Sequence, residues 1–460
     1  MTEIPKRSLD RRSLLKASAL VLGGAALTAC GPAATDAGGD AQPAAAPVVL
    51  RLSAWADVQD AVVYEAMVKA WQEKQSNYKV SVEQYPGGYY EKIQANFAGG
   101  TPADLLYYQG WQWQPYAQDK VISPLDDYIQ KDKAQAQFPE GANYNNMTKF
   151  GGGTYMTPTD TGSLVIYYNK DLFDKQGVPY PKKGWTWEEF QQAVEKLSFV
   201  EGDTRNYGWA QAAGWNGGYG RCTAFMRRNG HVEWDQVIEP KKADWDHEDV
   251  ISALQFLVYD AIQNQWSPSP DVIAGGGVGV DTGRVAMVFE GPWHMPRLWG
   301  ELATNPEKGI NFDVAEPPVG TTGINTTFGH VHGHCMTTAS QNKDAAWDLI
   351  KFILSDEGQK IIADGGRMSG TPDNIDKIWG PIASKRYNFT NTSAFSKGMA
   401  AGATPLIMGK GSPIHSYGGG PISKLWDKLL GLQDTAADAL KAANPEIQAI
   451  LDQYWKDKGA

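Results

Sequence analysis

Val48-Val49-Leu50-Arg51-Leu52 opens the stretch of sequence that decides the fold, and Leu105-Leu106-Tyr107-Tyr108 closes it. Both segments are rich in aliphatic and aromatic residues and predict strands. Val80 and Val82 alternate with polar neighbours as in a third strand. Two helices are predicted between the strands, where apolar residues recur at helical spacing: Val63, Met67, Ala70 and Trp71, then Tyr89, Ile93 and Phe97. This order predicts an α/β fold with a mostly parallel sheet flanked by helices.

The same alternation continues toward the C-terminus. We expect strands over residues 163–168 and 285–289, and helices over residues 250–262, 344–354 and 435–451. Thr186-Trp187-Glu188-Glu189 matches a capping box and predicts the start of another helix. The predicted mature chain, residues 30–460, exceeds the roughly 250–300 residues at which a single core stops growing, so we expect two domains or lobes.

The composition limits the kind of partner. The chain has 42 Lys and Arg against 52 Asp and Glu, and no basic stripe stands out, so we expect no nucleic-acid partner. The cysteines, Cys30, Cys222 and Cys335, form no C-x-x-C pair, which excludes a zinc ribbon or a dithiol redox motif. The 17 tryptophans suggest surfaces built for stacking, in addition to those that fill the core.

The N-terminal segment is typical of an export signal. Arg11-Arg12-Ser13-Leu14-Leu15-Lys16 precedes the apolar run Ala17–Ala26, which is shorter than the roughly 20 residues of a transmembrane helix. We predict a signal peptide over residues 1–29. The paired arginines resemble a twin-arginine signal, with imperfect matches at Asp10 and Leu14.

Leu27-Thr28-Ala29-Cys30 resembles a bacterial lipobox, in which the cysteine is lipidated and becomes the new N-terminus. Residues 30–47 are mostly Gly, Pro, Ala and Asp and predict a flexible linker. A lipidated Cys30 would hold an exported protein at the extracytoplasmic face of the cell membrane. The alternative is an ordinary cleaved signal followed by a chance cysteine.

Motifs of the common enzyme classes are missing from the sequence. The glycine-rich stretches at residues 151–153, 275–277 and 418–420 fit neither the P-loop nor the dinucleotide-binding pattern, so no nucleotide cofactor is expected. No G-x-S-x-G motif occurs. A glycosidase needs only two carboxylates at the right separation. Asp160 and Glu290 are candidates for this alternative, an exported carbohydrate-active enzyme.

The segment His330-Val331-His332-Gly333-His334 is the sharpest metal candidate. Alternate residues of a strand share one face, so three imidazoles could converge on a zinc ion. This alternative is a metal-binding solute receptor. The other interpretation is a polar stretch that lines a cleft, since the sequence names no fourth ligand.

Aromatic residues gather at predicted strand ends and in loops. They are Tyr107, Tyr108, Trp111 and Trp113 at the end of one strand and just beyond it, Trp209, Trp215 and Tyr219 in a glycine-rich loop, and Trp293 after another strand. Ligands of α/β sheets bind beyond the carboxyl ends of the strands. Aromatic faces can pack against the C–H faces of a sugar while amides and carboxylates bind its hydroxyls, so this distribution indicates a sugar site.

Four segments match one known family in order and spacing. They are residues 90–105, residues 164–190, residues 283–293 and residues 339–358. The most specific match is Tyr167-Tyr168-Asn169-Lys170 followed by Trp185-Thr186-Trp187-Glu188-Glu189-Phe190. From about Val48 to its end the chain resembles the extracellular solute-binding proteins of carbohydrate ABC transporters, the maltose-binding-protein-like family.

The resemblance implies a periplasmic-binding-protein-like fold of two α/β lobes, with the ligand cleft at the hinge. Lobe 1 would comprise residues 48–160 and 316–366, and lobe 2 residues 161–315 and 367–460. It implies a monomeric binding protein, not an enzyme and without a cofactor, that captures a sugar or oligosaccharide. The closed form would dock on the permease subunits of an ABC transporter. Other solutes, such as glycerol phosphates, bind to the same fold.

The resemblance also suggests ligand-binding positions. Trp293 falls where the family places a sugar-stacking tryptophan. Tyr108 and Trp111 fall in the family's aromatic and polar loop of the first lobe, and Trp111 replaces a residue that is often polar. Further candidates are Trp55, Asp160, Trp215, Tyr219, His330 and Arg367. Cys222 would lie in lobe 2 and Cys335 in lobe 1, where a disulfide would oppose closure, so we expect both to remain thiols.

Overall fold

The computed structural model describes residues 47–56, 58–210, 219–275, 278–279, 282–295, 298, 309–323, 327–400, 402–403, 406–409, 411–414 and 419–459. The predicted signal peptide, Cys30 and almost all of the predicted linker lie outside these residues, as does Trp215.

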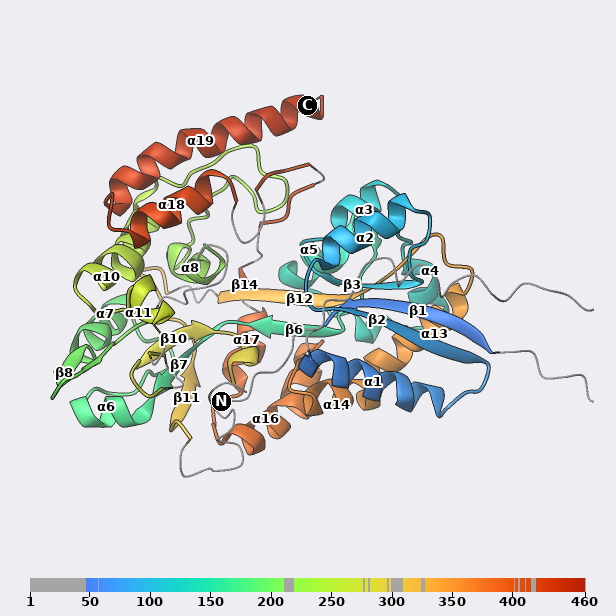
Figure 1. Cartoon of the computed structure of the whole chain (residues 1–460), viewed down its shortest axis with the longest axis horizontal. Helices are drawn as coiled ribbons and strands as arrows, with labels where there is room; N and C mark the ends of the chain where they lie inside the picture. Colours follow the sequence, from blue (N-terminus) through green and yellow to red (C-terminus); the bar gives the residue numbers. More distant parts are fainter. Residues whose placement is uncertain are drawn as a thin grey trace, which may run out of the picture. The chain divides into compact units, whose positions relative to one another are not determined.

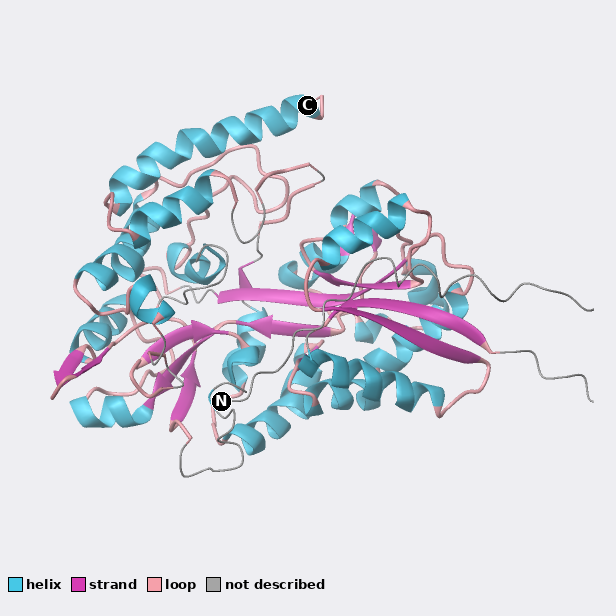
Figure 2. Ribbon diagram, viewed as in Figure 1, coloured by secondary structure: helices cyan, strands magenta, loops and turns pink. Residues whose placement is uncertain are grey.

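The described strands form two main sheets (Figures 1 and 2). The larger sheet has the order β13 (Met368–Ser369), β6 (Asp160–Ser163), β12 (Thr327–Met336), β3 (Leu105–Gln109), β1 (Val48–Trp55), β2 (Tyr78–Tyr85), and β14 (Gly402–Ala403) pairs with β12. Strands β1, β2 and β3 are parallel, as predicted. Strand β12 runs antiparallel to both β3 and β6.

The smaller sheet differs from the prediction in strand direction. It has the order β10 (Met287–Glu290), β7 (Val165–Asn169), β11 (Phe312–Ala315), and β7 is antiparallel to both neighbours. The expectation of a mostly parallel sheet is therefore wrong here. The reason is topological: β7 follows β6 after one residue and leads away from the larger sheet, whereas β11 leads back toward it. Two short hairpins, β4 (Lys149–Phe150) with β5 (Gly153–Thr154) and β8 (Phe199–Glu201) with β9 (Thr204–Asn206), complete the described strands.

Helices surround each sheet. In Figure 1, α2 and α3 lie on one side of strands β1–β3, and α1 and α14 lie on the other. The helices near the larger sheet are α1 (Val58–Gln72), α2 (Tyr89–Ala98), α3 (Gln114–Gln118), α4 (Asp126–Lys131), η1 (Gln135–Gln137), α5 (Ala142–Thr148), α13 (Lys343–Leu354), α14 (Asp356–Asp364), α15 (Pro372–Asn374), η6 (Ile375–Trp379), α16 (Gly380–Tyr387) and α17 (Ser393–Ala400).

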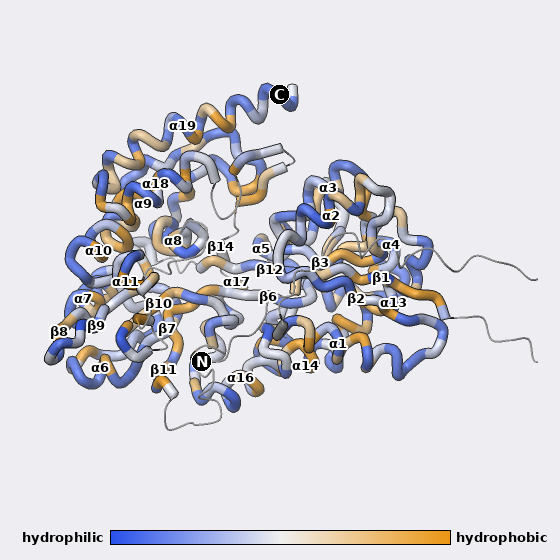
Figure 3. The backbone as a smooth tube through the Cα atoms, viewed as in Figure 1, coloured by the Kyte–Doolittle hydropathy of each residue, from blue (hydrophilic) through white to orange (hydrophobic). Residues whose placement is uncertain are grey.

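The helices near the smaller sheet are α6 (Lys170–Gln176), α7 (Trp187–Lys196), α8 (Tyr219–Met226), α9 (Glu248–Leu254), η2 (Gln255–Asp260), α10 (Ala261–Gln263), α11 (Pro270–Ala274), η3 (Pro292–His294), α18 (Pro421–Leu430) and α19 (Ala436–Asp457). Figure 3 shows hydrophobic and hydrophilic residues alternating along α19, as expected of a helix with one buried face. Among the described residues, no helix is long and apolar enough to cross a membrane.

The two groups form two α/β lobes, which confirms the predicted fold class. The predicted lobe boundaries stay a prediction. Strand β6 spans the predicted boundary between lobe 1 and lobe 2 at residue 160. Strand β13, at residues 368–369 in predicted lobe 2, still belongs to the larger sheet. Helix α17 then packs on β6 and β12, and the chain reaches the smaller sheet's lobe with α18 and α19.

Candidate functional site

Strands β6 and β12 carry the residues at the centre of the molecule (Figure 2). His330 and His332 share one face of β12 because alternate residues of a strand point the same way. Their rings stack with centroids 4.5 Å apart. The His330 ring lies 5.9 Å from that of Trp111 and 5.3 Å from that of Trp293. We call Trp111, Asp160, Trp293, His330 and His332 the central cluster.

On the side of the larger sheet, Asp160 anchors an ionic network. Its carboxylate accepts hydrogen bonds from Tyr107 Oη at 2.7 Å and from Arg367 Nη1 at 3.1 Å, and His332 Nδ1 lies 3.3 Å away. Arg367 also pairs with Asp60 at 2.7 Å. Burial raises the pKa of Asp160, but Arg367, His332 and Tyr107 together outweigh burial and hold it well below its usual value. Asp160 is therefore a fixed anion.

On the side of the smaller sheet, Glu290 plays the matching part. Glu290 is the last residue of β10. One of its carboxylate oxygens accepts hydrogen bonds from Arg221 Nε at 3.0 Å and from Arg221 Nη2 at 2.5 Å. The other oxygen accepts hydrogen bonds from Trp293 Nε1 at 3.0 Å and from the Gly291 amide at 3.3 Å. Both charged side chains are less than a tenth exposed. The carboxylate thus ties α8 to the indole of Trp293.

Two glycines make room for these rings. Gly162 pairs with His330 across β6 and β12, and a Cβ at Gly162 would approach both His330 and Trp293 to less than 3.0 Å. A Cβ at Gly291 would meet the Trp293 ring in the same way. The indole of Trp293 therefore lies directly against backbone, which fixes its position.

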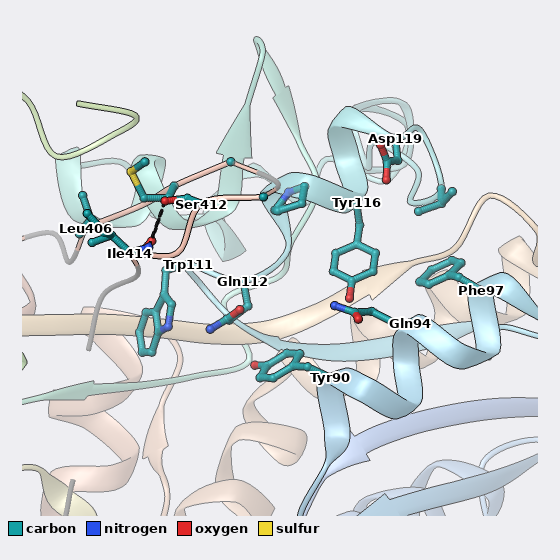
Figure 4. Close-up of a pocket in the computed structure, with 15 residues that line it drawn as sticks. Tyr90, Gln94, Phe97, Trp111, Gln112, Tyr116, Asp119, Leu406, Ser412 and Ile414 are labelled. Carbon is teal, nitrogen blue, oxygen red and sulfur yellow. Dashed lines mark hydrogen bonds between the residues drawn. The ribbon is translucent and has the colours of Figure 1, made fainter. Parts of the chain in front are cut away.

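A pocket of about 560 Å³ lies beside the central cluster (Figure 4). One wall comes from α2 and from the segment that runs from the end of β3 through α3, and the other from residues 406–409 and 411–414. Aromatic and amide side chains share the first wall; they are Tyr90, Phe97, Trp111, Tyr116, Gln94 and Gln112. Leu406, Met408 and Ile414 face them, with Ser412 and two glycines. Trp111 belongs to both the pocket and the central cluster.

The described lining residues include no Lys, Arg or His, and Asp119 is their charged member. Of the arginines nearest the central cluster, Arg221 is bound to Glu290, and Arg367 to Asp60 and Asp160. The described lining thus offers aromatic faces, side-chain amides and one carboxylate.

The structure brings together five of the predicted site residues: Trp111, Asp160, Trp293, His330 and Arg367. Three further predicted residues that it describes, Tyr108, Trp55 and Tyr219, lie elsewhere. Tyr108 is fully buried between Tyr90 and Tyr116 and backs the pocket wall. Trp55 is 43% exposed at the end of β1. Tyr219 lies in the core of the second lobe, hydrogen-bonded to Glu233. Trp215 lies outside the described residues.

The three histidines of β12 do not converge. His334 Nδ1 is 2.8 Å from Thr159 Oγ1, and its ring contacts Tyr107 rather than the other two imidazoles. Burial holds the pKa of His330 well below its usual value, so this ring is neutral. Within the described ranges, no group of three or more His, Cys, Asp or Glu residues is placed to hold a metal ion.

Several pocket residues were not predicted as binding residues from the sequence. Tyr90, Gln94 and Phe97 recur at helical spacing on α2 and therefore share one face of that helix. This spacing was the signal in the sequence that could have indicated a binding face. Arg221 and the wall at residues 406–409 and 411–414 carried no such signal, because their positions depend on contacts between distant parts of the chain. Cys222 and Cys335 are both buried and form no disulfide, as predicted.

Known proteins resemble this chain in sequence and in fold. Residues 55–360 match the family model described as bacterial extracellular solute-binding protein. A putative binding protein of Brucella abortus is 24% identical over 309 residues, 63% of this chain and 68% of that one. The sn-glycerol-3-phosphate-binding periplasmic protein UgpB of Rhizobium meliloti is 30% identical over 142 residues, 29% of this chain and 32% of that one.

Among solved structures, the ABC substrate-binding protein Lmo0181 from Listeria monocytogenes, in complex with cycloalternan, has the same fold. Its TM-score is 0.72 at 21% identity, over 88% of this chain and 99% of that one. The family match covers more than half of the chain and includes all five residues of the central cluster. The chain belongs to the bacterial extracellular solute-binding protein family.

Proposed function

We propose that this protein captures a sugar or oligosaccharide in the pocket beside Trp111 and delivers it to an ABC importer. The pocket carries the proposal. Its volume of about 560 Å³ lies within the usual range of ligand sites. Aromatic rings offer flat apolar faces to a sugar ring, and Gln94, Gln112 and Asp119 offer hydrogen bonds to its hydroxyls.

The ligand would extend from this pocket toward the central cluster. Trp293 would stack on a sugar ring, in line with the resemblance noted above. The described residues offer the buried Nδ1 of His330 no hydrogen-bond partner, so a ligand hydroxyl could take that place. Binding would draw the lobes together around the hinge strands β6 and β12. The family, and a Listeria protein of the same fold that binds cycloalternan, support this proposal.

A glycerol phosphate is the second candidate solute, because the Rhizobium meliloti relative is named for it. That likeness spans less than a third of either chain. A phosphate needs cationic partners, and the described lining of the pocket supplies none. We therefore favour a neutral sugar.

An enzymatic role finds no support in the two carboxylates proposed for it. A general acid must carry a proton near neutral pH. Asp160 has a pKa well below its usual value, and Glu290 is bound to Arg221 on one oxygen and to Trp293 on the other. We propose binding without catalysis, by a monomer that needs no metal or other cofactor.

The test of this function is a titration of tryptophan fluorescence with maltotriose and, separately, with sn-glycerol 3-phosphate. We expect saturable binding of maltotriose and none of the phosphate. Trp111→Ala should weaken binding about tenfold or more, as loss of a central aromatic contact does. Tyr180→Ala, an exposed aromatic of the second lobe, is the matched control and should leave the affinity unchanged. Binding of the phosphate alone would show that the sugar proposal is wrong.

The lipid anchor is a separate proposal that depends on Cys30. Lipidated Cys30, with residues 31–47 as a tether, would keep the receptor close to its permease at the extracytoplasmic face. Expressed in a bacterium and labelled with radioactive palmitate, the full chain should carry the label in the membrane fraction. Cys30→Ser should abolish the label. Equal labelling of both proteins would rule out Cys30 as the lipidated residue.

A further inference from the structure

Trp293 is held in one orientation by two charged residues from distant parts of the chain. Glu290 lies at the end of β10 and Arg221 on α8. One carboxylate oxygen of Glu290 accepts hydrogen bonds from the guanidinium of Arg221, and the other accepts a hydrogen bond from the indole Nε1–H of Trp293. The indole is also confined by Gly291, Gly162 and the ring of His330.

We infer that Arg221 and Glu290 are positioning residues, which set the indole of Trp293 at the angle that ligand stacking requires. This inference rests on the proposed role of Trp293 in binding. Arg221 neutralises the buried carboxylate and fixes its rotation. The carboxylate in turn gives the indole N–H one direction in which its hydrogen bond can form. Neither charged residue needs to contact the ligand.

The substitution Glu290→Gln should keep the hydrogen bond to Arg221 and remove the one to Trp293. A glutamine has one acceptor oxygen in place of two, and its NH2 group only donates. The charged guanidinium of Arg221 is the stronger competitor for that oxygen. The NH2 group would then face the Nε1–H of Trp293, donor against donor, and the indole would lose its preferred orientation.

The chain offers a matched control in the same lobe. Glu233 is fully buried and forms an ion pair with Arg227, while it also accepts the hydroxyl of Tyr219. Glu233→Gln removes a buried charge from the same lobe without contacting Trp293. Any effect that comes only from weakening the lobe should appear in both variants.

The first readout needs no ligand. The full chain is labelled with 5-fluorotryptophan, and the fluorine resonance of Trp293 is identified by its absence from Trp293→Phe. We expect Glu290→Gln to shift and broaden this resonance, and Glu233→Gln to leave it in place. An unchanged resonance in Glu290→Gln would overturn the inference.

The second readout is a double-mutant cycle on maltotriose affinity. Glu290→Gln alone should weaken binding about tenfold, a loss within reach of one aromatic stacking contact and its orientation. In a Trp293→Phe background, which lacks the N–H, Glu290→Gln should cause no further loss. Additive losses would mean that Glu290 acts independently of Trp293 and would overturn the inference. An unchanged affinity in Trp293→Phe itself would instead remove Trp293 from the proposed function, and the fluorine result would still decide on positioning.

Discussion

At the scale of single residues, buried charge is balanced by specific partners on both sides of the central cluster. Asp160 is 5% exposed and Glu290 is 7% exposed, and each is paired with an arginine. An unpaired charge at such a depth would be costly, so each buried carboxylate needs its arginine partner. These pairs hold the strand ends and the Trp293 indole in place around the candidate site.

Asp160→Asn should reveal this charge through the pH dependence of stability. The pKa of Asp160 in the folded protein lies below that in the unfolded chain, because Arg367 and two hydrogen bonds outweigh burial. Its stabilising contribution is therefore complete well above the unfolded pKa of about 3.9 and is lost as the pH falls below that value. We expect the variant to lose about 3 kcal/mol of unfolding free energy at pH 7.

Urea unfolding at pH 7 and at pH 3.5 measures this difference. The gap between the parent protein and Asp160→Asn should shrink at the lower pH, where the parent carboxylate begins to lose its advantage. Asp373→Asn is the control, since this aspartate forms an exposed pair with Lys377 and should matter little at either pH. A gap of equal size at both pH values would contradict the role of Asp160 as a fixed anion.

The sequence predicted some site residues and missed others for identifiable reasons. Trp111 and Trp293 follow strands, and the end of a strand is a place that a pattern can indicate. Tyr108 satisfied the same pattern and Tyr219 was expected in a glycine-rich loop, yet Tyr108 lies behind the pocket wall and Tyr219 lies in the core of the second lobe. Aromatic residues fill cores as readily as they line sites, and only the neighbours decide. Arg221 was missed because its partner Glu290 is 69 residues away in the chain.

At the scale of elements, periodicity and caps predicted most helices and strands. Thr186 Oγ1 accepts the amide of Glu189, and the Glu189 carboxylate accepts the amide of Thr186, which confirms the capping box at the start of α7. The direction of the strands in the smaller sheet was not predictable in this way. A strand's own residues do not state which neighbour it pairs with, and β7 is placed by its continuity with β6.

Removal of the cap side chain gives a local test of α7. Thr186→Ala deletes the acceptor of the Glu189 amide at 3.1 Å and should lower the unfolding free energy by about 1 kcal/mol. Gln192→Ala, at an exposed position of the same helix, should change it by less than about 0.5 kcal/mol. Urea unfolding followed by circular dichroism measures both. Equal effects of the two substitutions would show that the cap contributes nothing of its own.

At the scale of the whole molecule, a shared core joins the two lobes. One buried cluster belongs to the larger sheet and includes Leu50, Leu52 and Trp347, and another belongs to the smaller sheet's lobe. A third cluster draws on both sheets; Leu106 and Val331 come from the larger sheet, and Val165, Tyr167 and Val314 from the smaller. Neither lobe can lose its structure without exposing part of this shared core to water.

The cysteines can test this coupling, because each reports on a different core. Cys222 is 1% exposed on α8 in the second lobe's cluster, and Cys335 is fully buried on β12 in the shared cluster. Each thiol should react with a thiol reagent only where its surroundings have opened. Since the shared core links the lobes, we expect both thiols to become reactive at the same urea concentration.

Cys222→Ala and Cys335→Ala, each combined with Cys30→Ser, leave one thiol to follow. Urea unfolding of each variant, followed by tryptophan fluorescence, gives its overall stability, and the thiol midpoints are compared after correction for any difference. Saturating sugar, at about 100 times its dissociation constant, should stabilise the folded state by about 2.7 kcal/mol and raise both thiol midpoints together. A Cys222 thiol that reacts at distinctly lower urea than Cys335 would show that the second lobe unfolds alone. The shared core would then be too weak to couple the unfolding of the two lobes. A ligand that contacts both lobes would be what couples their unfolding.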